Sequence, residues 1–271
     1  MTKRPPGESI GTVQRVAEVL RFFAERGEAN LKELSVALSL APSTCHRLLD
    51  LLGRQGLIEQ DSVDRRYRVG MEMFRISALV QSREDIRSIA RPLLRELVDS
   101  CDETAVLSIY LPVEGKIFFA ERADSSRMLR YQLSMNVPVS VLWGASGRAI
   151  LAFLDNDTVD RIYESEGRAP GSGQSLPARR ALEKDLATIR ERGYDTTHGQ
   201  KIHGAVGIGA PVFGVGGKVV ASLCITVPES RIKKSDYPRL GAAVRAAADR
   251  LSQAIGSPNA STKETLHGRE S

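Results

Sequence analysis

Residues 30–49, NLKELSVALSLAPSTCHRLL, decide the fold of the N-terminal part of the chain. Asn30 and Glu33 have the spacing of a capping box, in which each side chain satisfies a backbone N–H of the other at a helix start. Apolar side chains then recur on one face at helical spacing: Leu31, Leu34, Ala37 and Leu38. Pro42 suits the first turn of a following helix, where its missing N–H would have no partner. The sequence therefore predicts two short helices joined by a tight turn at residues 39–41.

The second of these helices has one buried and one exposed face. Its apolar stripe consists of Cys45, Leu48, Leu49 and Leu52. The remaining positions of its first turns therefore point outward: Ser43, Thr44, His46, Arg47 and Asp50. Hydroxyl, imidazole and guanidinium groups near a helix N-terminus can donate hydrogen bonds to base edges or phosphates. We accordingly expect DNA contacts from Ser43, Thr44, His46 and Arg47.

A basic hairpin follows, after a helix stop at Gly56. Residues 57–60 and 67–69 alternate as two strands around a turn, with Arg65 and Arg66 at the wing. A preceding amphipathic helix would support the pair through Val13, Val16, Leu20 and Phe23. This order is that of a winged helix-turn-helix, which places one helix in the DNA major groove and a loop along the phosphates. We expect Arg65 and Arg66 to contact phosphates. The alternative is a winged helix that binds a protein, and the steep salt dependence of DNA binding separates the two.

Length and composition fit a two-domain globular protein. The chain has 271 residues, of which 42% are hydrophobic and 26% charged. The net charge of +5 is compatible with a nucleic-acid partner without indicating one. The three cysteines, at positions 45, 101 and 224, have no metal-ligand spacing, and an odd count without a signal peptide favours a reducing cytoplasm. No apolar run approaches the ~18–20 residues of a membrane span, so we expect a cytoplasmic protein that does not enter membranes.

Residues 71–90 are typical of a linker helix. Their loose apolar stripe contains Met71, Phe74, Ala78 and Leu79, and it would pack either on a partner chain or within its own chain. Pro92 would break or kink a continuous helix, which predicts that a new helix starts there.

Beyond Ser100 the periodicity changes from helix to strand and back. Strands are expected over 104–111 and 117–120 as a hairpin, over 129–133 as a third strand, and over 206–213 and 218–227 around a glycine-rich turn. Helices are expected over 147–154, 158–165, 178–192 and 235–254. This mixture predicts an antiparallel α+β sandwich and not a doubly wound sheet. The polar residues 257–271 are expected to be disordered.

The two halves together resemble the IclR family of bacterial transcriptional regulators. The segments that carry the resemblance are Leu31–Leu49, Tyr67–Gly70, Gly147–Ala152, Arg192–Tyr194, Gly204–Val212, Val219–Pro228 and Arg231. The resemblance implies a winged helix-turn-helix over residues 10–70, a linker helix over 71–90, a GAF-like effector-binding domain over 91–256 and a tail over 257–271. It also implies homodimers or homotetramers on palindromic double-stranded operators. Such a protein would control catabolic genes in response to a small organic acid, more often as a repressor than as an activator.

The stretch Trp143–Arg148 leads into a helix, and free N–H groups at a helix N-terminus attract anions. The resemblance implies that the backbone N–H groups of Ala145 and Ser146 hold the effector carboxylate. The alternative is ordinary capping of the helix by Ser146.

Four further positions are assigned to the effector pocket by the resemblance alone. Relatives that bind small keto acids often have an acidic residue, a cysteine and two hydroxyls where this chain has Thr197, Gly207, Cys224 and Thr226. The loss of the acid and of a cysteine side chain implies a larger, less acidic pocket, suited to a larger organic acid, with aromatic acids as candidates. Positive character nearby would come from His198, Lys201 and His203, and further lining from Tyr131, Val139 and Leu142.

Catalysis is the main rival class, and the residues argue against it. Gly144–Gly147 is similar to a nucleophile elbow, but that motif requires glycine where Arg148 stands. Residues 204–209 are glycine-rich, yet no helix follows them, which argues against a dinucleotide fingerprint. Cys101 and Cys224 form no obvious redox pair. We therefore expect no enzyme activity, cofactor or metal; a sensor with a protein-binding winged helix remains the second alternative.

Overall fold

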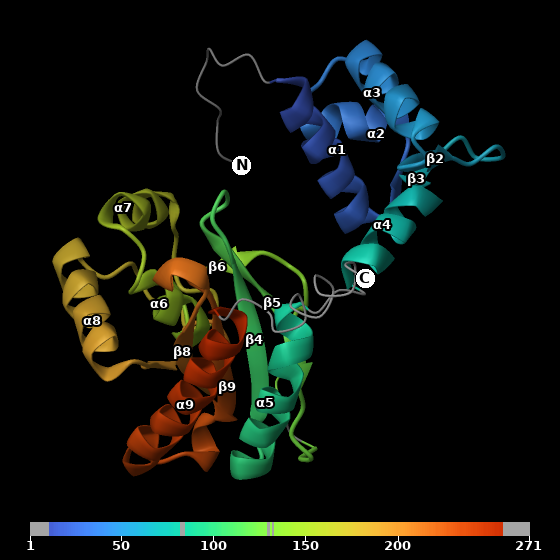
Figure 1. The fold of residues 1–271 in the computed structure, drawn as a ribbon. Coiled ribbons are helices and arrows are strands. Elements are labelled where there is room, and N and C mark those ends of the chain that lie inside the picture. The colour runs from blue at the N-terminus through green and yellow to red at the C-terminus, as the bar shows by residue number, and fades with distance from the viewer. Residues whose placement is uncertain (1–10, 82–84, 129–130, 132, 257–271) are drawn as a thin grey trace, which may run out of the picture. The chain divides into compact units, whose positions relative to one another are not determined.

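The computed structural model describes residues 11–81, 85–128, 131 and 133–256. The chain divides into two compact units, residues 1–84 and 85–271, and each is considered separately (Figure 1). No helix among these described residues is long and apolar enough to cross a membrane.

The first unit is a helical bundle with a small antiparallel sheet. Its helices are α1 (Thr12–Arg26), α2 (Leu31–Leu38), α3 (Pro42–Arg54) and α4 (Met71–Gln81). Its strands are β1 (Glu28–Ala29), β2 (Ile58–Gln60) and β3 (Tyr67–Val69), paired in the order β1-β3-β2. The predicted helices and hairpin are thus confirmed, while β1 was missed because two residues carry no periodicity.

The predicted capping box is present at the start of α2. The Glu33 backbone N–H donates to the Asn30 side-chain oxygen over 2.9 Å, and the Asn30 backbone N–H donates to the Glu33 carboxylate over 3.0 Å. Two predicted apolar contacts are wrong. Val13 is 84% exposed, and Ala37 is also exposed. The predicted Phe23 is fully buried, and Val16 and Leu20 pack partly buried against the same core, to which the fully buried Val19 also belongs although it was not predicted.

The linker prediction needs a correction at its C-terminal end. Helix α4 ends at Gln81 and not at residue 90, and α5 (Ile86–Cys101) begins behind Asp85, whose carboxylate accepts N–H groups from Arg87 and Ser88. Pro92 lies inside α5 and does not start a helix. The lost hydrogen bond is offset by the buried face of α5, formed by Ala90, Leu93, Leu94 and Leu97. The apolar residues of α4 remain exposed, with Met71 71%, Phe74 60% and Leu79 53% accessible.

The second unit is built on a six-stranded antiparallel sheet in the order β6-β5-β4-β9-β8-β7. The strands are β4 (Thr104–Leu111), β5 (Lys116–Ala123), β6 (Val139–Ser140), β7 (Asp195–His198), β8 (Ala205–Phe213) and β9 (Val219–Pro228). The remaining helices are α6 (Ala145–Leu151), α7 (Asn156–Ser165), α8 (Arg179–Arg192) and α9 (Tyr237–Gly256). The predicted α+β class with an antiparallel sheet is confirmed.

Alternation along the strands separates two faces of this sheet. Along β8, Val206, Ile208, Ala210 and Val212 belong to the core that α5 and α9 cover. Gly207 and Gly209 face the opposite side, toward the start of α6. The same alternation on β9 places Leu223 and Ile225 in the α5–α9 core, and Cys224 in a separate cluster with Ala145 of α6. Helices α5 and α9 lie side by side in Figure 1.

Two predictions for this unit, a third strand and a disordered tail, fall wholly or partly on residues outside the described part of the chain. The third strand was expected over 129–133, of which residues 129, 130 and 132 lie outside the described residues, and Tyr131 and Leu133 are not in a strand. The strand that pairs with β5 of the hairpin is β6, in register Ile117 with Val139, while β4 pairs with β9. The tail over 257–271 also lies outside the described part of the chain. Strand β7 was missed, because its sequence is polar throughout.

Candidate functional site

The exposed face of α3 carries the residues expected to contact DNA. Ser43, His46 and Arg47 are exposed and Thr44 is partly buried. The opposite face is anchored by Cys45, Leu48, Leu49 and Leu52, all buried. The helix begins with Pro42 behind Ala41, an N-cap residue whose side chain has no acceptor. Its first N–H groups thus lack a side-chain cap, and the Thr44 and Cys45 N–H groups donate to the Ala41 carbonyl.

The wing arginines have different surroundings. Arg65 is exposed, in a left-handed conformation with φ of 59°, at the edge of the hairpin loop. Arg66 instead pairs with Glu28 of β1 over 2.9 Å and with Glu33 of α2 over 3.1 Å. Because Glu33 also completes the capping box, Arg66 ties the hairpin to the start of α2. We therefore propose a structural role for Arg66 in place of the expected phosphate contact, which stays a prediction for the exposed Arg65.

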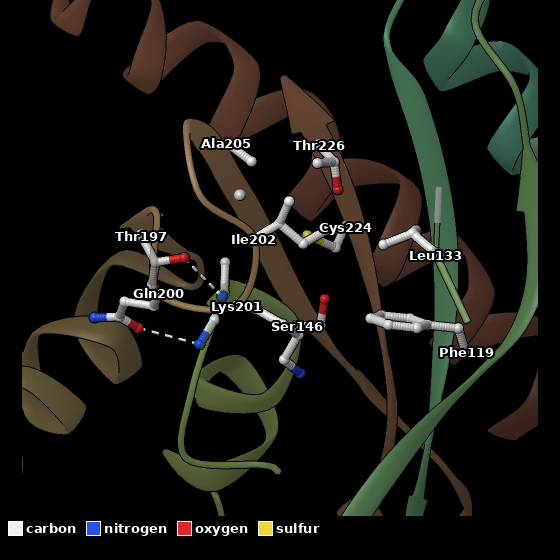
Figure 2. Close-up of a pocket in the computed structure, with 13 residues that line it drawn as sticks. Phe119, Leu133, Ser146, Thr197, Gln200, Lys201, Ile202, Ala205, Cys224 and Thr226 are labelled. Atoms are coloured by element: carbon white, nitrogen blue, oxygen red, sulfur yellow. Dashed lines mark hydrogen bonds between the residues drawn. The ribbon is translucent and has the colours of Figure 1, made fainter. Parts of the chain in front are cut away.

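In the second unit, a cavity of about 30 Å³ lies between β8, β9, β5 and the start of α6 (Figure 2). Its lining comprises Phe119, Leu133, Gly144, Ala145, Ser146, Thr197, Gln200, Lys201, Ile202, Ala205, Gly207, Cys224 and Thr226. Strand register places Thr197 beside Gly207 and Gly207 beside Thr226, so three neighbouring strands contribute one row. The structure thus gathers six of the seven residues assigned to the effector pocket, the exception being Tyr131.

The start of α6 is already bound to oxygen atoms of the chain itself. The Ala145 N–H donates to the Thr197 hydroxyl over 3.0 Å, and the Gly144 N–H donates to the Gln200 side-chain oxygen over 3.1 Å (Figure 2). Gly144 is the N-cap residue and no side chain at that position caps the helix, so capping by Ser146 is wrong. Two side-chain oxygens therefore already accept the N–H groups that a ligand carboxylate would accept. A ligand that binds the Ala145 N–H must displace the Thr197 hydroxyl.

The expectation of a larger pocket is wrong. About 30 Å³ accommodates roughly two water molecules, at about 10–15 Å³ each. A Cβ placed on Gly207 would lie 3.3 Å from the Ala145 Cβ, and one on Gly209 would lie 2.8 Å from the Ala145 carbonyl carbon. The missing side chains on β8 thus let α6 approach the sheet closely, and the space that they vacate is filled.

Lys201 is the pocket residue with the most unusual environment. Part of its side chain reaches solvent, but its ammonium group is buried and donates to the Ser140 carbonyl over 3.0 Å. It also lies 5.4 Å from the centre of the Phe119 ring. Burial lowers the pKa of Lys201 to about 8, and burial raises the pKa of the neighbouring Cys224 thiol to about 11. The pocket therefore contains a thiol that stays neutral and an amine that titrates near physiological pH.

The other residues expected around the pocket lie outside it. The Tyr131 hydroxyl donates to the Gly204 carbonyl over 2.6 Å and so holds the loop over residues 199–204. His198 faces Tyr237 at 3.3 Å, and His203 is exposed. Val139 and Leu142 pack in hydrophobic clusters without lining the cavity. Sequence reasoning missed Phe119, Leu133, Gln200, Ile202 and Ala205 as lining, and noted Lys201 only as a nearby charge.

A buried ion pair fixes α6 behind the pocket. The Arg148 guanidinium donates to Asp195 of β7 over 2.8 Å, and both side chains are under 10% exposed. Arg148 also reaches Asp185 of α8 over 3.1 Å. Asp195 and Thr197 lie two residues apart on β7, so one strand holds α6 at two points. Arg148 stands at the position where a nucleophile elbow would need glycine, and its guanidinium is engaged in these ion pairs.

Comparisons with known proteins agree with both units. The family model described as "IclR helix-turn-helix domain" matches residues 12–62, and that described as "Bacterial transcriptional regulator IclR C-terminal" matches residues 78–253. The regulator BhcR of Paracoccus denitrificans is 29% identical over 244 residues, covering 90% of this chain and 86% of that protein. The transcriptional repressor IclR of Escherichia coli K12 is 26% identical, covering 93% and 92%.

Solved structures give the same result. An ICLR transcriptional regulator from Silicibacter sp. TM1040 superimposes with a TM-score of 0.81 at 27% identity, covering 92% of this chain and 97% of that one. An IclR homolog from Microbacterium hydrocarbonoxydans, complexed with 4-hydroxybenzoate, shares the fold with a TM-score of 0.71 at 22% identity, covering 90% and 99%. With a family match over more than half of its length, the chain belongs to the IclR family of DNA-binding bacterial transcriptional regulators.

Proposed function

We propose that this regulator represses catabolic genes and that a small organic acid, bound in the cavity beside α6, changes its affinity for a palindromic operator. The observation that carries the proposal is the coincidence of two sites in one chain. Six assigned effector residues line one cavity, and the assigned base-reading residues share the exposed face of α3. Named repressors among the relatives support the sign of regulation.

On the DNA side, Ser43, Thr44, His46 and Arg47 read base edges from the N-terminal half of α3, and Arg65 contacts a phosphate. A homodimer or homotetramer presents recognition helices to half-sites about one DNA turn, ~34 Å, apart. The apolar and exposed side chains of α4, Met71, Phe74 and Leu79, are suited to the contact between subunits.

On the effector side, a carboxylate accepts N–H groups from Ala145 and Ser146 after displacing the Thr197 hydroxyl. Thr197 and Thr226 then offer hydroxyls to the acid, while Gly207 and Cys224 form the floor. Because the unliganded cavity is small, a ligand larger than a few atoms must move the 199–204 loop, which carries Gln200, Lys201 and Ile202. Ligand binding thereby shifts the population of conformations that bind the operator.

The first test is binding of the purified protein to its own upstream DNA and to scrambled DNA at two salt concentrations. Selective binding that weakens steeply with salt is expected, because phosphate contacts release counterions. Binding without sequence preference, or no binding, would favour a protein-interaction role for the winged helix. A panel of aliphatic and aromatic acids, including 4-hydroxybenzoate, then tests the effector site through the fluorescence of Trp143, which lies next to Gly144 in the pocket wall.

A further inference from the structure

The cavity beside α6 contains a buried positive charge without a matching negative one. Lys201 contributes its ammonium group, and none of the other twelve lining residues is acidic. Within the part of the chain that the structure describes, no carboxylate forms an ion pair with the Lys201 ammonium, whose hydrogen-bond acceptor is a backbone carbonyl of Ser140. A buried ammonium requires either a counter-ion or deprotonation.

The charged and titratable groups around Lys201 do not supply that counter-ion. Glu166, which follows α7, favours the charged lysine from a distance, but among the described residues its carboxylate accepts from the Ser140 hydroxyl and makes no ion pair with the Lys201 ammonium. Asp195 of β7 is held by Arg148. Cys224 of β9 stays protonated, because burial raises its pKa to about 11, and His203 on the same loop is exposed. The face of Phe119 provides the remaining, weaker compensation.

We propose that Lys201 determines the specificity of this pocket, pairing its ammonium group with the negative charge of the ligand and making ligand affinity depend on pH. The proposal rests on the proposed function, since it names the residue that selects anions at the same site. The anion would then be held at two points, by the N–H groups of α6 and by Lys201, and the second of these points lies on the 199–204 loop. Anion binding is thereby tied to the position of the loop.

The direction of the pH effect follows from linkage. The free lysine has a pKa of about 8, and a bound anion raises it, so binding takes up a proton around and above that pH. Only the protonated fraction binds well, and that fraction falls from about nine-tenths at pH 7 to about one-tenth at pH 9. Affinity for a carboxylate should therefore be about tenfold weaker at pH 9 than at pH 7.

The experiment compares charged and neutral probes of the same shape: acetate with acetamide, and benzoate with benzamide. Dissociation constants are measured by calorimetry at pH 7 and pH 9 on wild type, Lys201→Met and Lys201→Arg. Lys218→Met, which removes an exposed lysine from the same unit, is the matched control. Wild type and the control should prefer the carboxylate by about tenfold or more at pH 7 and lose most of that preference at pH 9.

The two variants separate charge from titration. Lys201→Met should show, at both pH values, only the weak preference that wild type keeps at pH 9, whereas Lys201→Arg should keep the full preference at both, because arginine does not titrate in this range. The midpoint of urea unfolding without ligand adds an independent readout. Lys201→Met should unfold at the same or higher urea concentration than wild type, since it removes an unpaired buried charge, whereas a lysine with a purely structural role would lower it.

The outcomes distinguish this inference from the proposed function. If Lys201→Met still prefers carboxylates and wild type shows no pH dependence, acids bind in the pocket without Lys201, and the inference is wrong while the proposed function stands. If no carboxylate binds wild type at either pH, the effector site itself is refuted and the inference falls with it. Lower stability of Lys201→Met together with unchanged binding would also overturn the role given to Lys201.

Discussion

The proposed recognition surface and the proposed ligand pocket of this regulator are built in opposite ways. The outward face of α3 uses residues from one helical turn and a half, and their exposure follows from helical spacing alone. The pocket brings together residues from Phe119 to Thr226, on the four strands β5, β7, β8 and β9, on helix α6 and on the loops that join these elements. Its contents depend on which distant segments approach each other. Local sequence therefore specifies the first site, while the second depends on tertiary packing and on the buried charges that maintain it.

The largest effect is expected from breaking the buried ion pair behind the pocket. Arg148→Met leaves Asp195 buried with only the longer contact to Arg192, at 3.6 Å. The second unit should lose about 3–5 kcal/mol of unfolding free energy. Urea unfolding followed by Trp143, the only tryptophan in the chain, reports on this unit specifically.

The matched control for that prediction is Arg179→Met, which removes an arginine from the partly exposed pair with Asp160 in the same unit. Its cost should stay within about 1 kcal/mol. Equal losses for the two variants would show that burial does not distinguish these pairs, and the contrast drawn between the two sites would weaken.

The next effect concerns the recognition helix. Arg47→Ala should weaken operator binding by about 1–3 kcal/mol if Arg47 contacts a base, with no change in the Trp143 unfolding curve. Arg54→Ala is the control, since Arg54 is exposed in the last turn of the same helix and paired with Asp50 at 2.9 Å. Anisotropy of labelled operator DNA measures both variants. Unchanged affinity of Arg47→Ala would remove this residue from the base-reading set.

A smaller loss of stability is expected at the start of α2. Asn30→Ala removes one half of the capping box and should cost about 1 kcal/mol. Because the change is confined to the first unit, amide hydrogen exchange of α2 should speed up while the exchange of β8 and β9 stays as in wild type. Faster exchange in both units would indicate that the two do not open independently.

The smallest effects separate the wing arginines. Arg65→Ala should lower the slope of log affinity against log salt by about 1, the value for one phosphate contact. Arg66→Ala should leave that slope unchanged and cost at most about 1 kcal/mol of stability, because its partly exposed pairs with Glu28 and Glu33 tie the hairpin to α2. The reverse result would restore Arg66 as the phosphate contact.

How well the sequence predicts each site also differs between the exposed face of α3 and the pocket beside α6. The spacing of apolar residues predicts α2, α3 and the hairpin, and it also predicts which face of α3 is exposed. The pocket residues Thr197, Gly207 and Thr226 came from the family resemblance, since periodicity says nothing about which strands are neighbours. Packing then overrode two local rules. Pro92 lies inside a helix because its neighbours are buried, and Gly207 brings α6 closer where an enlarged cavity was expected.

Strand β7 is the most instructive omission. Its sequence, Asp195-Thr196-Thr197-His198, is polar throughout and gives no sign of a strand. Two of its side chains nevertheless hold α6, Asp195 through Arg148 and Thr197 through the Ala145 N–H. A polar strand at a sheet edge forms when its side chains have specific partners, and those partners lie about 50 residues away in sequence. Only the tertiary structure reveals them.

The central claim is that the pocket of the second unit controls the DNA affinity of the first. Its most direct test is the dissociation constant for operator DNA, with and without the acid that binds best, in wild type and in Thr226→Val. The account predicts a severalfold change in wild type, equal to the factor by which operator DNA changes the affinity for the acid. Thr226→Val should bind operator as wild type does and respond less to the same acid concentration. An acid that fills the pocket while operator affinity stays constant would contradict the account.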